Sequence, residues 1–151
     1  MKTPRIHVVC AVAVAIVIAI AAGAMTATEA IKERQKRMEG VRDGMMALAA
    51  IAKKEQPFEA EVIRASAAKM ADHLKKSEKL YPAGSGEGEV KTWAKPEIWS
   101  DRDGFDKLMS STHKAAVDMQ SVTEAEAFGP ALGKLGTGCK SCHELYRLPK
   151  N

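Results

Sequence analysis

The chain is poor in aromatic residues, which make up only 5% of its 151 positions, so its core must rely on Ala, Leu, Val and eight Met. It also lacks a basic stripe interleaved with aromatics, because its Lys and Arg alternate with Asp and Glu. A nucleic-acid partner is therefore excluded. The sequence shows no internal repeat and no strand pattern, and nothing in it supplies a general acid, a general base or a substrate cleft. These absences predict one all-α domain that is not an enzyme.

Cysteine is scarce too, yet two of the three Cys stand close together near the C-terminus. Cys139 and Cys142 are separated by two residues, and His143 follows directly, which is the attachment signature of a c-type haem. On a helix the two thiols lie on one side and can bond to the two vinyl groups along one porphyrin edge. His143 lies on the same face and can supply the proximal iron ligand. The sequence thus predicts one covalently attached haem c, whose ring would add apolar bulk to the core.

Two other uses of the Cys pair fit less well. A thioredoxin-like dithiol needs a βαβ setting and a helix N-terminus that lowers the thiol pKa, whereas here a Leu and Gly run precedes the pair. A structural zinc site needs four ligands, and His7, His73 and His113 stand alone without a second cluster at zinc spacing.

The N-terminus has the features of an export signal. A positively charged start precedes the apolar run of residues 8–22, and Ala22-Gly23-Ala24 is a small-x-small cleavage site. We expect residues 1–24 to be a signal peptide and residues 25–151 to be one domain exported to the periplasm. The apolar run also reaches the lower limit for a bilayer span, so the alternative is an uncleaved anchor. Association with a membrane is expected only in that case.

Helical periodicity predicts four amphipathic helices. The first runs from Glu29 to Lys53 and the second from Pro57 to about Leu80. The third runs from the capping segment at Asp101 to Met119. The fourth runs from a capping box at Thr123 to the residues before Pro149, with a kink or restart at Pro130. Only the connection between the second and third helices is long, and its Trp93 and Trp99 are expected to cover the core edge. Short links elsewhere favour an antiparallel four-helix bundle with the cofactor inside.

Two residues of the first helix stand out on its apolar stripe. Arg34 places a charge where the pattern requires an apolar side chain, and the ordinary role of such a residue is to snorkel to solvent. Met38 follows one turn later, and core filling is the usual role of a Met at helical spacing.

The chain resembles the cytochrome c-prime family, and within it the cytochrome c-556 branch most. The resemblance extends from about Ile31 to Leu148 and rests on five groups of residues. These are Arg34-Gln35, Met45-Met46-Ala47-Leu48, Pro57-Phe58, Pro96-Glu97-Ile98-Trp99 with Phe105, and the Cys139 to His143 motif followed by Tyr146-Arg147.

The resemblance implies roles for seven residues. Cys139 and Cys142 would bind the haem and His143 would be the proximal ligand. Arg147 would lie near the proximal face, and Arg34 and Gln35 near the haem edge, where Arg34 would pair with a propionate. Met38 occupies the distal position. The c-556 branch uses a Met there as sixth ligand, whereas an apolar residue leaves the iron of cytochrome c-prime five-coordinate.

From these residues we expect a one-electron carrier ligated by His143 and Met38 that exchanges electrons with redox partner proteins. The alternative is a five-coordinate haem protein that binds nitric oxide or carbon monoxide. A haem peroxidase would need a distal His and Arg, and neither His73 nor His113 has an evident path to the iron. Relatives pair through their first two helices, so either a monomer or a homodimer is expected.

Overall fold

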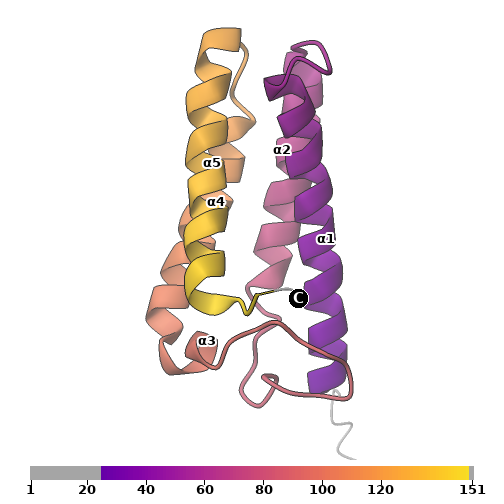
Figure 1. Cartoon of the computed structure of the whole chain (residues 1–151), viewed down its shortest axis with the longest axis vertical. Helices are drawn as coiled ribbons and strands as arrows, with labels where there is room; N and C mark the ends of the chain where they lie inside the picture. Colours follow the sequence, from indigo (N-terminus) through magenta and orange to yellow (C-terminus); the bar gives the residue numbers. More distant parts are fainter. Residues whose placement is uncertain (1–24, 150–151) are drawn as a thin grey trace, which may run out of the picture.

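The computed structural model describes residues 25–149, and the predicted signal peptide lies outside this part. Its helices are α1 (Ala27–Ala52), α2 (Ala60–Ser77), α3 (Glu97–Ser100), α4 (Arg102–Met119) and α5 (Ala125–Tyr146). The four long helices run alternately up and down side by side, which confirms the predicted antiparallel four-helix bundle (Figure 1). The single-turn helix α3 was not predicted. None of the helices in this part is long and apolar enough to cross a membrane.

The helix starts differ in part from those predicted. Asp101 caps α4 as expected, because its Oδ1 accepts a hydrogen bond from the Gly104 amide at 3.2 Å. The predicted capping box at Thr123 is wrong, since the N-cap of α5 is Glu124, which makes no side-chain cap. Pro130 lies within α5 without ending it, so the loss of one backbone donor is tolerated there.

Helix packing buries the predicted apolar stripes. α1 packs on α2, α2 on α4, and α4 on α5. The α2 stripe is buried throughout, and it consists of Ile63, Ala67, Met70, Leu74 and Ser77. The buried residues of α1 end on Ile51, whereas Ala52 is exposed. Among the described helices, α1 and α5 are not packed directly against each other along their lengths, and a cavity lies between them.

The long connection, residues 78–96, crosses one end of the bundle and meets the C-terminal end of α5 (Figure 1). An antiparallel bridge joins Ala94 to Arg147. Next to it the Lys95 amide donates to the Tyr146 carbonyl at 3.0 Å, and the Leu148 amide donates to the Trp93 carbonyl at 2.7 Å. The connection is therefore fixed to the segment that follows the Cys-x-x-Cys-His motif.

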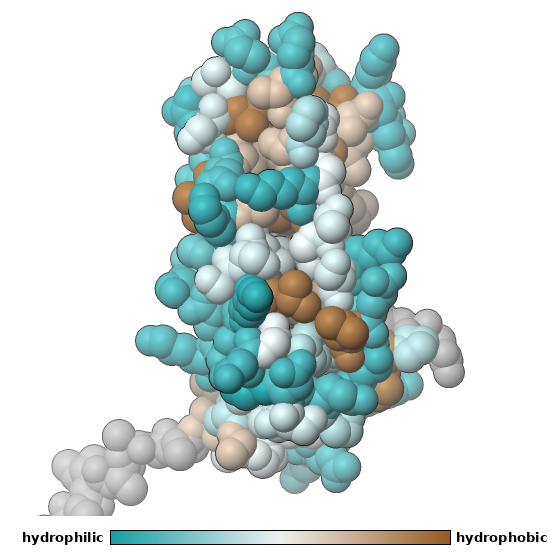
Figure 2. Space-filling model, turned by 90° about the vertical axis from the view of Figure 1, so that its left-hand side faces the viewer, coloured by the Kyte–Doolittle hydropathy of each residue, from teal (hydrophilic) through white to brown (hydrophobic). Residues whose placement is uncertain are grey.

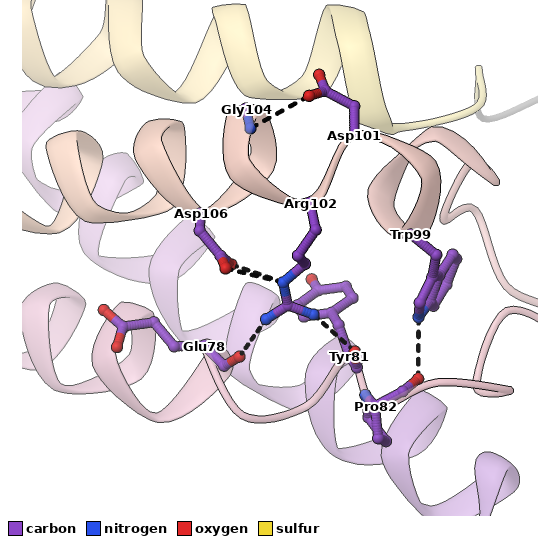
Figure 3. Close-up of polar contacts among 8 residues, drawn as sticks. All are labelled: Glu78, Tyr81, Pro82, Trp99, Asp101, Arg102, Gly104 and Asp106. Atoms are coloured by element: carbon purple, nitrogen blue, oxygen red, sulfur yellow. Dashed lines mark hydrogen bonds and ion pairs between the residues drawn. The ribbon is translucent and has the colours of Figure 1, made fainter.

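Side chains fasten the same connection to the helices. Trp99 packs against the core and its Nε1 donates to the Pro82 carbonyl at 2.9 Å, as expected of a residue that covers the core edge (Figure 3). Arg102, at the start of α4, donates to the Tyr81 carbonyl at 2.8 Å and to the Glu78 carbonyl at 3.4 Å (Figure 3). The end of α2 and the start of α4 are thereby joined directly.

The surface on the α4 and α5 side is mostly hydrophilic, with hydrophobic residues in separate spots (Figure 2). The large exposed apolar residues of these helices and of the segment after α5 are Val117, Leu145 and Leu148. Scattered apolar residues of this kind are ordinary for a solvated surface.

Candidate haem site

The cavity between α1 and α5 has a volume of about 420 Å³, which lies in the usual range for a small-molecule or cofactor site. Its walls are mainly apolar and come from all four long helices and from the connection between α2 and α4. They include Met38, Val41 and Met45 of α1, Met109 and Thr112 of α4, and Cys139, Cys142 and His143 of α5. The structure thus brings the predicted haem-binding residues together at the cavity between α1 and α5.

The two thiols and the imidazole suit a c-type haem. Cys139 and Cys142 are half-buried, unbonded to each other and on the face of α5 that continues the core stripe. Burial raises the pKa of the Cys139 thiol and raises that of Cys142 to about 11. A redox-active dithiol requires the opposite shift, so the thioredoxin-like alternative does not fit. Within residues 25–149 no group of three or more His, Cys, Asp or Glu side chains is placed to hold a metal ion alone, as a zinc site requires.

Gly138 lets α5 come close to α4 just before the first thiol. A Cβ at this position would lie 2.7 Å from Thr112 Oγ1, which is buried and donates to the Leu108 carbonyl. Any larger residue would therefore push the start of the motif away from α4.

Arg34 is buried at the cavity wall, with only 3% of its surface exposed. Its guanidinium donates to Thr92 Oγ1 at 2.9 Å, to Ser85 Oγ at 3.3 Å and to the Leu80 carbonyl at 3.5 Å. It does not snorkel, and among residues 25–149 no carboxylate pairs with it. Burial lowers its pKa from the ordinary value. A buried cation with neutral partners alone is suited to receive an anionic group of a bound cofactor.

Gln35 and Arg147 line the same cavity at the end where the connection crosses. Gln35 Nε2 donates to the Lys91 carbonyl at 2.8 Å, which ties α1 to the connection. The backbone of Arg147 forms the bridge with Ala94, and its side chain is exposed.

A row of aromatic rings in the cavity wall was not anticipated from the sequence. Phe105 lies between Tyr81 and Tyr146, with ring centroids 4.7 Å and 5.3 Å away in edge-to-face geometry. Phe105 and Tyr146 lie on the buried faces of α4 and α5, which helical periodicity can predict. Tyr81 follows α2 in the long connection, where no periodicity could have placed its ring.

A four-helix bundle that holds a Cys-x-x-Cys-His motif in a cavity of this size defines a c-type haem protein. The chain belongs to the cytochrome c′ family, since the family model described as Cytochrome C' matches residues 29–147. It is 32% identical over 136 residues to cytochrome c-556 of Agrobacterium fabrum, covering 87% of this chain and 89% of that one. The solved cytochrome c' of Rhodopseudomonas palustris superposes with a TM-score of 0.76 at 33% identity, covering 81% of this chain and 98% of the other. The resemblance noted from the sequence is confirmed.

Membership in this family confirms the predicted cofactor, one covalently bound haem c with its iron. The thiols, the imidazole and the buried Arg34 described above all fit that group.

The predicted electron carrier ligated by His143 and Met38 is wrong. The matched family is that of cytochrome c′, whose iron is five-coordinate and binds nitric oxide or carbon monoxide. One solved structure of the same fold is a nitric oxide complex of a cytochrome c prime mutant from Alcaligenes xylosoxidans. It superposes with a TM-score of 0.72 at 24% identity, covering 82% of this chain and 98% of that one. Met38 is half-buried and packs against the core, which is the usual role of a Met at helical spacing.

Proposed function

We propose that this chain is a five-coordinate haem c protein that binds nitric oxide or carbon monoxide, with His143 as the single iron ligand from the protein. The observation that carries the proposal is the cavity itself. His143 stands on one wall, and the inward stripe of α1 opposite α5 presents Met38, Val41 and Met45. An apolar wall of this kind admits a small neutral diatomic gas and disfavours water and charged ligands.

The remaining residues take supporting roles in this proposal. The bound haem iron supplies the gas-binding and one-electron chemistry. Cys139 and Cys142 fix the group by two covalent bonds to α5. Arg34 receives a propionate with Gln35 beside it, and Arg147 lies near the proximal face. His73 and His113 are not among the residues that line the cavity, so neither supplies the distal His that a haem peroxidase needs, and we propose that the protein is not an enzyme.

The place of action follows from the N-terminus and the cofactor. We propose that residues 1–24 are removed as a signal peptide and that residues 25–151 act in the periplasm. Carbon monoxide binds only ferrous haem iron, so we propose that a redox partner protein reduces the iron there. The functional unit is a monomer or a homodimer.

The visible spectrum of the purified holoprotein tests the proposal. The ferrous form should be high-spin, and carbon monoxide should convert it at once to a low-spin spectrum. A ferrous form that is already low-spin and does not take up carbon monoxide would contradict the proposal.

A further inference from the structure

The last turn of α5 is anchored by the side chain of Tyr146. Its hydroxyl donates a hydrogen bond to Asp101 Oδ2 at 2.5 Å, and its ring packs edge-to-face on Phe105. The residue is only 4% exposed. The hydrogen bond to Asp101 raises the pKa of Tyr146 to about 12, so the hydroxyl keeps its proton at neutral pH.

Asp101 is itself a fixed acceptor at the junction of α3 and α4. Its Oδ1 accepts a hydrogen bond from the Gly104 amide at 3.2 Å, as Figure 3 shows, and its own amide donates to the Glu97 carbonyl at 2.8 Å. Both oxygens of the carboxylate therefore accept hydrogen bonds, Oδ1 as the cap of α4 and Oδ2 from Tyr146 of α5.

Gly104 leaves the space that this contact needs. A Cβ at Gly104 would lie 2.6 Å from Tyr146 Oη and would also overlap the Asp101 carboxylate. The hydrogen bond between Tyr146 and Asp101 thus requires a residue without a side chain on the first turn of α4.

The anchored turn contains His143, three residues before Tyr146. The Arg147 amide donates to the His143 carbonyl at 3.2 Å, and the Tyr146 carbonyl accepts from the Lys95 amide at 3.0 Å. The backbone that carries the imidazole is therefore joined to α4 by a side chain and to the long connection by its main chain.

We propose that Tyr146 is a positioning residue that restrains His143 and thereby weakens gas binding. This inference rests on the function proposed above. With haem held by Cys139, Cys142 and His143, gas binding at its iron would shift the His143 imidazole and the turn that carries it. The hydrogen bond between Tyr146 and Asp101 restrains the turn and opposes this movement. The free energy needed to move the restrained turn lowers the affinity for the gas.

The test uses the holoprotein and three variants. Tyr146→Phe removes only the hydroxyl, and Gly104→Ala keeps the hydroxyl but forces it away from Asp101. Ser77→Ala is the matched control, because it removes a buried hydroxyl that donates to the His73 carbonyl on α2, outside the cavity. Hydrogen exchange of the Arg147 amide reports the restraint directly, and carbon monoxide titration of the ferrous protein reports its consequence.

In Tyr146→Phe and Gly104→Ala, we expect the Arg147 amide to exchange about fivefold faster, as the loss of one hydrogen bond predicts. The dissociation constant for carbon monoxide should fall by about threefold in both. Ser77→Ala should change neither quantity. Unchanged exchange, or faster exchange with unchanged affinity, would overturn the inference. If the wild-type protein bound no carbon monoxide, the proposed function would fail, while the exchange rates would still decide whether Tyr146 restrains the turn.

Discussion

The guanidinium of Arg34 lies over the ring of Tyr81, with Cζ 5.2 Å from the ring centroid. Both residues are buried and both line the cavity. Burial raises the pKa of Tyr81 to about 12, and the nearby Arg34 opposes this shift only in part. The pair is therefore a cation stacked on a neutral ring, in which the phenol does not neutralise the guanidinium.

Tyr81 should make the protein sensitive to alkali. The pKa of its phenol in the folded chain is about 12, which exceeds the ordinary value of 10.0. The contribution of this group to the unfolding free energy is therefore complete below pH 10 and is lost as the pH rises toward 12. The shift corresponds to roughly 2 to 3 kcal/mol of unfolding free energy. Tyr81→Phe should lose correspondingly less stability between pH 8 and 12 in urea unfolding. Tyr146, whose pKa is raised in the same direction, is present in both proteins. Equal losses in the two proteins would contradict the assignment.

Replacing Arg34 should destabilise the holoprotein strongly. Arg34→Leu removes three hydrogen bonds and leaves the proposed propionate without its cation, which should lower the unfolding free energy by about 3 to 5 kcal/mol. Gln35→Ala is the control, because its single exposed hydrogen bond to the Lys91 carbonyl should contribute about 1 kcal/mol or less. Denaturant unfolding measures both. A loss for Arg34→Leu no larger than that for Gln35→Ala would remove the case for a buried anionic partner.

Met38→Ala should leave the spin state of the haem unchanged. Because Met38 packs against the core without binding iron in the proposed site, its truncation should cost about 2 kcal/mol of stability, the low end for a Met that is only half-buried. The visible spectrum and urea unfolding check the two parts. Met45→Ala, at the same wall two turns along α1, should behave alike. Loss of a low-spin spectrum in Met38→Ala alone would show that its sulfur had been bound to iron.

The covalent attachment has its own test. Cys139→Ser and Cys142→Ser should each retain at most one thioether bond, and His143→Ala should lose the normal spectrum, because the iron has no protein ligand on that side. Mass spectrometry of the denatured protein and absorption spectroscopy provide the two measurements. Two thioether bonds in either variant would contradict the assignment of the replaced thiol as a haem attachment site.

Export can be checked independently of the haem. Lys2, Arg5 and the small residues Ala22-Gly23-Ala24 predict removal of about the first 24 residues. The intact mass of the native protein should therefore correspond to residues 25–151 plus one haem. A full-length mass recovered from the membrane fraction would instead support an uncleaved anchor.

The sequence by itself determined the class of fold and the kind of cofactor. Apolar residues at three- and four-residue spacing define the buried faces of α2, α4 and α5, since a helix has no other way to bring them to one side. The grouping of Cys139, Cys142 and His143 is likewise local, because residues three and four positions apart on a helix share a face whatever the rest of the chain does.

Only the tertiary structure decided which distant residues meet. The neutral partners of Arg34 come from 46 to 58 positions along the chain, and the bond between Tyr146 and Asp101 spans 45. The first set depends on the path of the long connection, which has no periodicity from which contacts could be predicted, and the second depends on how α5 packs against the start of α4. The spacing of Met38 placed it at the cavity wall but said nothing about a bond to iron. Helical geometry fixes which way a side chain points, whereas the distance between two helices is set by everything packed between them.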